Sequence, residues 1–407
     1  MGRIEYDFEG HLGNVGHVIR LLTFSTLYPN AVRPNHGVFV ETRLRHLLDQ
    51  GNVTADVIAP VPWFPFPSAR FGEYGAFARV PADEIRRGIR VAHPRYPVIP
   101  KIGMNAAPWL LYQTMKKHVL KKLKNGADFD VIDAHYFYPD GVAAAMLGRR
   151  FNKPVVITAR GSDINQIADF PVPRKRILKA AEQAAGLVTV CQALKDRMVD
   201  LGVPEDKVLV LRNGVDLERF QRPDDRAALR ARLNIDGKTV LSVGHLIARK
   251  GHDLVIQALR HLPAVDLLIA GDGPEDASLR RLAQAISVAD RVEFLGSLAQ
   301  DQLADYYGAA DALVLASSRE GWANVLLESM ACGTPVAASN VWGTPEVVST
   351  RQAGILFDER SPEAIARTIA RLLEEPPDPA AVRSHAKKFS WDDTSQGQLT
   401  LFRSILG

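Results

Sequence analysis

The chain has 407 residues, of which 46% are hydrophobic and 24% charged, and it carries a formal net charge of +4 with a pI near 9.0. This composition is typical of a globular protein long enough for two full cores, and the basic excess is too weak to indicate a nucleic-acid-binding protein. The two cysteines, Cys191 and Cys332, belong to no CxxC or Cys/His cluster, so neither a disulfide framework nor a zinc site is predicted.

The beginning of the chain does not resemble a secretory signal. Residues 1–17 contain glycines and acidic residues where a signal peptide would be apolar, and residues 1–16 are interpreted as a leader before the first strand. No run reaches the roughly eighteen apolar residues of a membrane-spanning helix. We therefore expect a cytoplasmic protein.

The first half of the chain alternates β-branched runs with amphipathic stretches of helical length, which is typical of βαβ units around a parallel sheet. It opens with a strand over residues 17–25 and a helix over residues 38–51. The Pro-rich residues 59–71 are interpreted as a long surface loop. The remaining predicted strands of this half cover residues 55–60, 129–136, 153–161, 186–192 and 207–215.

Residues 109–124 read as an amphipathic helix with five lysines beside Trp109 and several leucines. Two interpretations stay open. The helix docks the protein on anionic lipid at the inner leaflet, or it packs on its own sheet with solvated lysines.

The second half repeats the alternation more regularly, and the polar, breaker-rich residues 213–236 join the halves. We predict two doubly wound Rossmann-like α/β domains, residues 1–213 and 214–384, followed by a helix within residues 385–407 that crosses back to the first domain. Ligands of such sheets bind beyond the carboxyl ends of the strands, so two facing domains form one cleft. The predicted strands of this half cover residues 239–246, 265–273, 291–297, 310–318, 335–340 and 353–357.

A basic loop follows the first strand of the second half. Arg249 and Lys250, next to the glycines Gly244 and Gly251, combine two cations with free backbone amides, which suits a diphosphate. The alternative is an ordinary solvated loop. No Walker sequence or intact GxGxxG accompanies it, which argues against a P-loop NTPase or a dinucleotide oxidoreductase.

The segment "EGWANVLLESMACGTPV" places Glu320 in a glycine loop and Glu328 eight positions later in an apolar helix. A helix starting near residues 322–324 points its amides at the cleft. Two carboxylates there would repel and resist burial unless cations or polyols satisfy them, and Arg249 and Lys250 are suitable cations. The alternative for Glu328 is a hydrogen bond to a neighbouring backbone group.

This segment matches the Glu, seven residues, Glu motif of the retaining glycosyltransferases of family four, which have the two-domain GT-B fold. The segments "NGVDLERF", "ARKG", "IAGDGP", "VEFLG" and "GTPEVV" follow that family's usual order. The first half contains the segments "HGVFV", "DVIDAHYFYPDG" and "ITARGSD". In these segments it resembles members of the family that act on bacterial polysaccharides.

The resemblance implies a role for each matching position. Glu320 would bind the hydroxyls of the donor sugar, Glu328 would hold the ribose of the nucleotide, and Arg249 with Lys250 would neutralise the diphosphate in place of a metal ion. No cofactor is implied, and the donor is expected to be a UDP- or GDP-linked sugar. The other donor-binding candidates are Gly321, Trp322, Ala323, Asn324, Val325, Gly37, Gly244, Gly271 and Leu295.

In the first half the resemblance puts His135 beside the transferred sugar, although a lone histidine is more often a structural hydrogen-bonding group. Arg160 and Asp163 are acceptor-side candidates that either form a local ion pair or bind the acceptor. One departure is His245, where many relatives have an arginine, and Arg249 is expected to supply the second charge instead.

The sequence is thus identified as a retaining, metal-independent hexosyltransferase that uses a nucleotide sugar and a glycan or lipid-linked acceptor of bacterial exopolysaccharide or cell-envelope synthesis. Two rival functions stay open. One is a nucleotide-sugar epimerase or hydrolase on the same fold. The other is a non-catalytic subunit that binds a partner glycosyltransferase, which the histidine at position 245 favours.

Overall fold

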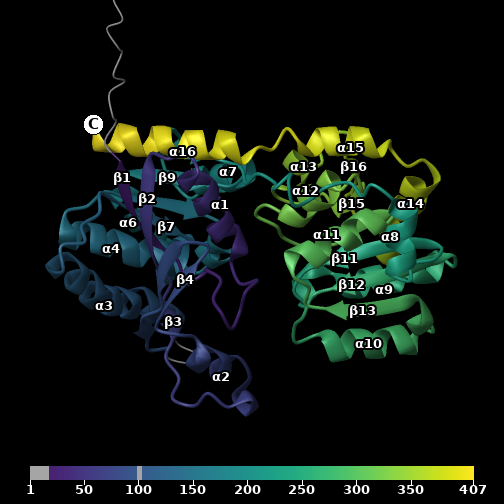
Figure 1. The fold of residues 1–407 in the computed structure, drawn as a ribbon, viewed down its shortest axis with the longest axis horizontal. Coiled ribbons are helices and arrows are strands. Elements are labelled where there is room, and N and C mark those ends of the chain that lie inside the picture. The colour runs from purple at the N-terminus through teal and green to yellow at the C-terminus, as the bar shows by residue number, and fades with distance from the viewer. Residues whose placement is uncertain (1–17, 99–102) are drawn as a thin grey trace, which may run out of the picture.

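The computed structural model describes residues 18–98 and 103–407, so the predicted leader over residues 1–16 lies outside the described residues. Two α/β units lie side by side, each with a largely parallel sheet covered by helices on both faces (Figure 1). The predicted fold class, two doubly wound parallel-sheet domains, is confirmed. The domain boundaries at residues 213 and 384 stay predictions.

The first sheet has the strand order β10-β9-β8-β7-β1-β2-β5-β4. Its central strands are continuous apolar runs, because a parallel sheet is buried on both faces. The order reverses between β1 and β7, which pair in parallel. The strands of this half are β1 (Ile19–Phe24), β2 (Val53–Ile58), β3 (Val61–Pro62), β4 (Asp83–Arg86), β5 (Ile89–Ala92), β6 (Arg95–Tyr96), β7 (Val131–His135), β8 (Val155–Ala159), β9 (Gly186–Thr189) and β10 (Val208–Val210).

Helices cover both faces of this sheet, and alternate residues of one strand serve the two cores. Leu22 and Phe24 of β1 join the cluster under α3, α4 and α6, while Ile19 and Leu21 join the cluster under α1 and α16. The helices of this half are α1 (Val38–Leu48), α2 (Gly72–Arg79), α3 (Gly103–Lys124), α4 (Val142–Phe151), α5 (Ser162–Asn165), α6 (Pro171–Gln183) and α7 (Gln192–Asp200).

The second sheet has the order β13-β12-β11-β14-β15-β16, so its order reverses between β11 and β14. All five neighbouring pairs are parallel. The strands are β11 (Lys238–Val243), β12 (Val265–Ala270), β13 (Val292–Gly296), β14 (Ala312–Leu315), β15 (Val336–Ser339) and β16 (Gly354–Phe357). The helices are α8 (Arg226–Arg232), α9 (His252–Ala258), α10 (Asp276–Ala285), α11 (Gln300–Ala309), α12 (Asn324–Ala331), α13 (Thr344–Val347), α14 (Pro362–Glu374), α15 (Pro379–Ala386) and α16 (Trp391–Leu406).

The sequence reading missed the antiparallel hairpin β4–β5 at the edge of the first sheet. Arg87 and Gly88 between its strands have φ values of 49° and 82°. Two successive positive φ values are typical of the tight turn that matches strand twist in two-residue hairpins. The surface loop predicted over residues 59–71 also differs, because it includes β3 and leads into α2.

The chain crosses back to the first domain through α16, which runs along the first unit in Figure 1. This helix begins at Trp391, not near residue 385, because α15 ends at Ala386 and Ser390 caps the new helix by accepting a hydrogen bond from the Asp392 amide. Leu399 and Phe402 are buried against the first sheet and α1. The last helix therefore completes the core of the first domain.

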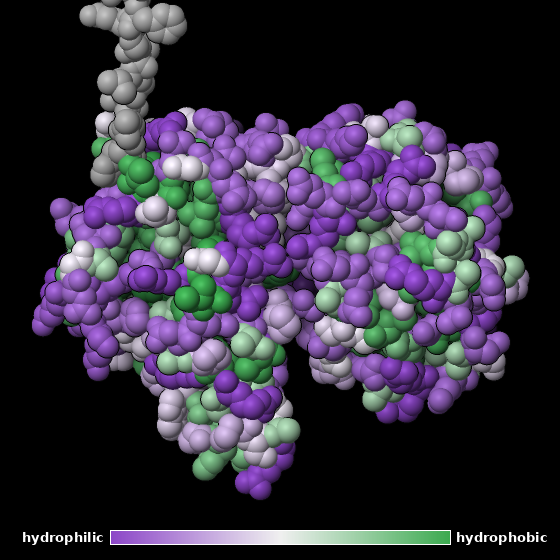
Figure 2. Space-filling model, in the orientation of Figure 1, coloured by the Kyte–Doolittle hydropathy of each residue, from purple (hydrophilic) through white to green (hydrophobic). Residues whose placement is uncertain are grey.

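Contacts between the halves lie at several points around the interface. Glu346 of α13 accepts hydrogen bonds from the amide of Gln192 and the guanidinium of Arg212. On another side, the Asn35 amide donates to Ser297 and to the carbonyl of Leu298. Figure 2 shows that the two lobes join above and part below, where a groove separates them.

Removing the buried ring of α16 tests how much this helix stabilises the first domain. Phe402 is fully buried, so Phe402→Ala is expected to lower the free energy of unfolding by about 3–5 kcal/mol. The matched control is Leu406→Ala on the same helix, where the side chain is 40% exposed and the expected change is within about 0.5 kcal/mol. Urea unfolding followed by circular dichroism measures both, and equal midpoints for the two variants would contradict the packing argument.

Candidate functional site

The centre of the site is an ion pair at the point where the strand order of the second sheet reverses. Lys250 follows β11 and Glu320 follows β14, and these neighbouring strands end at the same edge of the sheet. The Lys250 Nζ donates to Glu320 Oε1 at 2.7 Å. Ligands of doubly wound sheets bind at such a reversal, so the geometry places the two predicted residues where a ligand is expected.

The pair is shielded from water, since its side chains are 16% and 8% exposed. Burial acts to raise the pKa of the Glu320 carboxyl, but the charge and hydrogen bond of Lys250 hold that pKa below its ordinary value. Glu320 is therefore ionised at neutral pH. Arg249 lies beside it, with Nη1 donating to the carbonyl of Arg319 at 2.6 Å.

Glycines let the loops of this edge pack closely. A Cβ at Gly271 would lie 1.9 Å from the carbonyl oxygen of Gly244, and one at Gly251 would lie 2.3 Å from that of Ala316. The Lys250 side chain runs along Gly244, where a Cβ would lie 3.3 Å from the lysine Cε. The loops after β11, β12 and β14 thus meet with the lysine extended between them.

The loop after Glu320 contacts the first domain. A Cβ at Gly321 would lie 2.1 Å from the carbonyl oxygen of Arg160, so no other residue fits without moving the domains apart. As predicted, a helix begins near residue 324, since α12 starts at Asn324. The Asn324 Oδ1 accepts a hydrogen bond from the Asn213 amide at 3.1 Å. The remaining predicted loop positions are Trp322 and Ala323, which are buried, and Val325, which is half-buried.

Glu328 has a side-chain partner that the sequence reading missed. The hydroxyl of Tyr307 donates to Glu328 Oε2 at 2.9 Å, so the expected alternative of a backbone partner is not what the structure has. Burial raises the pKa of the Glu328 carboxyl to about 7, although the tyrosine hydrogen bond acts in the opposite direction. No local sequence signal identifies Tyr307, because it lies on α11, 21 residues away.

In the first domain His135 ends β7, and its ring is held inside the protein. Its Nε2 lies 3.1 Å from Asp133 Oδ2, and its Nδ1 lies 2.8 Å from the Arg160 guanidinium. The side chain is only 1% exposed. The prediction that it lies beside the transferred sugar is untested, and both ring nitrogens already have partners.

A buried polar network extends from this histidine to the last helix. Asp133 accepts a hydrogen bond from Gln398 of α16, and the Oε1 of Gln398 accepts one from Arg43 of α1. Arg160 also donates to Asn213, the residue that contacts Asn324. The two buried guanidinium groups of Arg43 and Arg160 thus share the side-chain oxygen of Asn213, and burial lowers the pKa of both arginines.

The carboxylate of Asp163 accepts hydrogen bonds from backbone amides instead of pairing with the side chain of Arg160. The donors are the amides of Arg160, Gly161 and Phe137, at 2.6–3.1 Å. The local ion pair, one of the two predicted alternatives, is therefore not formed as a hydrogen-bonded side-chain pair. Binding of an acceptor by these residues stays a prediction.

The predicted loops at the edges of the site are placed as follows. Gly37 precedes α1 with φ of 68° and packs on the backbone of Leu27. His245 is 53% exposed in its side chain and lies 3.4 Å from Asp272. Leu295 lies half-buried in β13, the strand next to β12.

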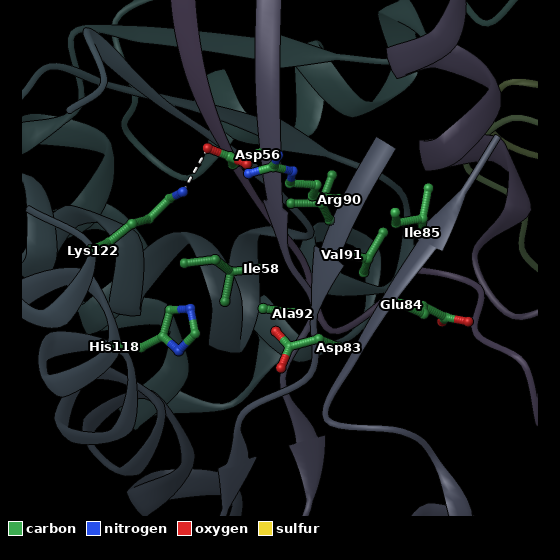
Figure 3. A pocket seen from close by; sticks show the side chains of 11 residues that line it. Asp56, Ile58, Asp83, Glu84, Ile85, Arg90, Val91, Ala92, His118 and Lys122 are labelled. Atoms are coloured by element: carbon green, nitrogen blue, oxygen red, sulfur yellow. Dashed lines mark hydrogen bonds and ion pairs between the residues drawn. The ribbon is translucent and has the colours of Figure 1, made fainter. Parts of the chain in front are cut away.

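A cavity lies apart from all predicted site residues. It measures about 370 Å³ and lies between α3 and the strands β2, β4 and β5. Figure 3 shows His118 and Asp83 directed toward each other across it, and Lys122 bonded to Asp56 at its rim. Among residues 18–98 and 103–407, no group of three or more His, Cys, Asp or Glu side chains is arranged to hold a metal ion.

Comparisons with known proteins agree on one family. The family described as "Glycosyltransferase Family 4" matches residues 36–219, and "Glycosyl transferases group 1" matches residues 225–389. The chain is 30% identical over 369 residues to "Putative teichuronic acid biosynthesis glycosyltransferase TuaC" of Bacillus subtilis, covering 88% of this chain and 90% of that protein. It is 34% identical over 306 residues to the D-inositol 3-phosphate glycosyltransferase of Acidothermus cellulolyticus, covering 68% of each.

Solved structures have the same overall fold. The sucrose-phosphate synthase of Thermosynechococcus elongatus superposes with a TM-score of 0.78 at 22% identity, covering 95% of this chain and 99% of that one. Anabaena HepE in complex with UDP-glucose superposes with a TM-score of 0.71 at 19% identity, covering 95% and 100%. The GT-B arrangement expected from the sequence is confirmed.

The buried histidine makes folding sensitive to acid. Burial lowers the pKa of His135 to about 4, while an unfolded histidine titrates near 6.5. Between about pH 6.5 and pH 4 His135 is therefore protonated in the unfolded chain but not in the folded chain. The free energy of unfolding falls over this range by on the order of 3 kcal/mol.

Thermal unfolding at pH 4–7 measures this loss. His135→Gln keeps a side chain that accepts from Arg160 and donates to Asp133 but does not titrate, so its melting temperature is expected to fall less over that range. Identical pH profiles for the variant and the natural protein would exclude His135 as the cause.

Proposed function

This chain belongs to the glycosyltransferases, with a family 4 first half and a group 1 second half, and on that premise we propose that it transfers a sugar from a nucleoside diphosphate donor to a hydroxyl acceptor with retention at the anomeric carbon. The ion pair between Lys250 and Glu320 is the observation that carries this proposal. It puts a cation and a hydroxyl-binding carboxylate next to each other at the ligand-binding edge of the sheet.

The cation suits the leaving group. Lys250, with Arg249 beside it, would bind the two phosphates of the donor and stabilise the charge that develops as the bond to the sugar breaks. Because these side chains are partly shielded from water, their attraction to the diphosphate is stronger than in bulk solvent. We propose that they act without a metal ion.

The carboxylate suits the sugar. Once the diphosphate attracts Lys250, the second oxygen of Glu320 and the neighbouring amides are available to sugar hydroxyls. In the transfer the bond from the anomeric carbon to the diphosphate oxygen breaks and the bond to the acceptor oxygen forms on the same face. The acceptor proton passes to the leaving diphosphate, so no protein nucleophile is required.

Glu328 is proposed to bind the ribose. A carboxylate accepts two hydrogen bonds from a vicinal diol, and Tyr307 holds one of its oxygens in place. The donor is proposed to be UDP- or GDP-linked, and the complexes of Anabaena HepE with UDP and UDP-glucose support the first.

The acceptor is proposed to be a glycan or lipid-linked glycan of the cell envelope, as the name of the Bacillus subtilis relative suggests for that protein. Within the described residues no helix has the length and apolar character to cross a bilayer. We propose a cytoplasmic enzyme that touches the inner leaflet peripherally. The contact would come from lysines of α3, since Leu111, Met115 and Val119 of that helix pack in the core and Lys117, Lys121 and Lys124 are exposed.

Replacing the lysine tests the proposed chemistry. Lys250→Ala removes the cation and leaves Glu320 buried without its partner, so kcat is expected to fall about 10²–10³-fold. Lys250→Arg is expected to retain more activity, and Lys238→Ala, at the exposed start of β11, is the matched control. Release of nucleoside diphosphate from UDP- and GDP-sugars measures the rate, and full activity of the alanine variant would rule out the assigned role.

Nucleotide binding tests the role of Glu328. Calorimetry with UDP, GDP, ADP and their common sugars is expected to find one nucleotide that binds without added metal, and Glu328→Ala is expected to weaken it at least tenfold, while the exposed Glu359→Ala does not. Because the free carboxyl has a pKa of about 7 and the ribose binds its ionised form, affinity is expected to rise about tenfold between pH 6 and pH 8.

Glu328→Gln serves as the control for the pH series, since the titration of the nucleotide's own phosphates remains in that variant. If no nucleotide binds to well-folded protein, the transferase proposal fails and the non-catalytic subunit becomes the leading interpretation.

A further inference from the structure

A small projecting lobe carries aromatic residues that the proposed chemistry does not use. It comprises residues 61–79, from β3 through α2, and we call it the aromatic lobe. Figure 1 shows α2 below the first sheet, on the side of the groove that separates the two units in Figure 2. Trp63, Phe66 and Tyr74 of this lobe are 58%, 54% and 42% exposed. Large rings are rarely left this open in one short segment without a binding partner.

The rings form an ordered surface. Phe64 is the centre, with ring centroids 5.3–6.0 Å from those of Phe66, Phe71 and Tyr74. Helix α2 is pressed onto the preceding loop, because a Cβ at Gly75 would lie 2.2 Å from the carbonyl oxygen of Ser68. Packed rings lose little freedom when a ligand lies on them, so such a surface binds at low entropic cost.

The lobe is tied to the mouth of the cleft through the loop before α1. Arg33 of that loop lies 5.4 Å from the ring centroid of Phe77 and 3.3 Å from the carboxylate of Glu73. Two residues on, Asn35 donates hydrogen bonds to Ser297 and Leu298 across the cleft. The loop that packs on the lobe is therefore the same loop that contacts the second domain, so the lobe lies next to this contact between the domains.

The chemistry of the lobe favours a carbohydrate over a lipid bilayer. Between the open rings stand charged side chains, and Glu73, next to Tyr74, is 72% exposed in its side chain. Insertion into a bilayer would dehydrate that carboxylate at a high cost in free energy. A pyranose presents C–H groups on its faces and hydroxyls at its edge, which match aromatic planes flanked by arginine and glutamate.

We propose that the aromatic lobe binds sugar units of an extended glycan acceptor, several residues away from the hydroxyl that reacts. The proposal rests on the proposed function, since it assumes a glycan in the cleft, and it adds that the acceptor is an oligomer or polymer. Trp63 is the central contact, because at 58% its side chain is the most exposed ring of the lobe.

Binding to defined glycans tests this inference on the full-length protein. The probes are hexasaccharides of cellulose, chitin and polygalacturonic acid, together with an array of bacterial capsule and wall polysaccharides, and saturation-transfer NMR is the readout. At least one glycan of four or more units is expected to bind, and Trp63→Ala combined with Phe66→Ala is expected to weaken it tenfold or more. Trp109→Ala on α3 is the matched control, since that indole is 54% exposed.

Binding of UDP and GDP is measured in the same preparations and is expected to be equal in the natural protein and both variants, which separates this test from that of the proposed function. The inference is overturned if the double variant binds every glycan as the natural protein does, or if no glycan binds at all. It is also overturned if the double variant instead loses binding to vesicles of phosphatidylglycerol, which would make the lobe a membrane contact.

Discussion

The hydrogen-bonded ion pair between Lys250 and Glu320 is the constraint around which the second domain is organised. A carboxylate this buried would be unstable without a cation in direct contact, and the cation needs a path through the protein to reach it. Gly244 provides that path, because the Lys250 side chain runs along it. Lys250 and Glu320 are 70 positions apart in the chain, but they follow the strands β11 and β14, which are adjacent in the sheet. The pair therefore also fixes which loops form the floor of the cleft.

Charge has a different use in the first domain. Arg43, Arg160, Asp133 and His135 are all buried, and they connect α1, two central strands and α16 into one network. Such a network holds its members in one arrangement, because breaking any of its bonds leaves a charged or polar group without a partner. The last helix thereby supports the wall of the cleft from behind, while Arg160 reaches Asn213 and, through it, the start of α12.

Helix α3 and the aromatic lobe of the first domain differ in how much of their apolar surface is buried. Helix α3 buries Leu111, Met115 and Val119 in the core and leaves its lysines exposed. The aromatic lobe instead leaves Trp63, Phe66 and Tyr74 exposed, because so short a segment is too small to bury all of its own rings. The exposed rings of this domain are therefore concentrated in the aromatic lobe, while α3 adds the open indole of Trp109 among its lysines.

The sequence by itself determined the fold class and predicted the candidate residues of the second-domain site, of which Lys250 and Glu320 lie together. Alternating apolar runs and helical stretches predict parallel sheets, and a parallel sheet places the carboxyl ends of its strands at one edge. The sequence alone therefore predicts that Lys250 and Glu320 lie close together. Local pattern also predicted the start of α12. These features depend on residues that are close together in the chain, so they can be predicted from the sequence alone.

Only the tertiary structure decided which groups face each other across long separations. Tyr307 beside Glu328, Gln398 beside Asp133, and the Arg160 guanidinium beside His135 instead of Asp163 depend on how helices pack over the sheets. A single sequence carries no periodic signal for such contacts, because burial of a polar side chain is satisfied by whichever partner the packing brings within about 3 Å. The environment of His135 and the pKa of Glu328 follow from those partners, and so they could be read only from the folded chain.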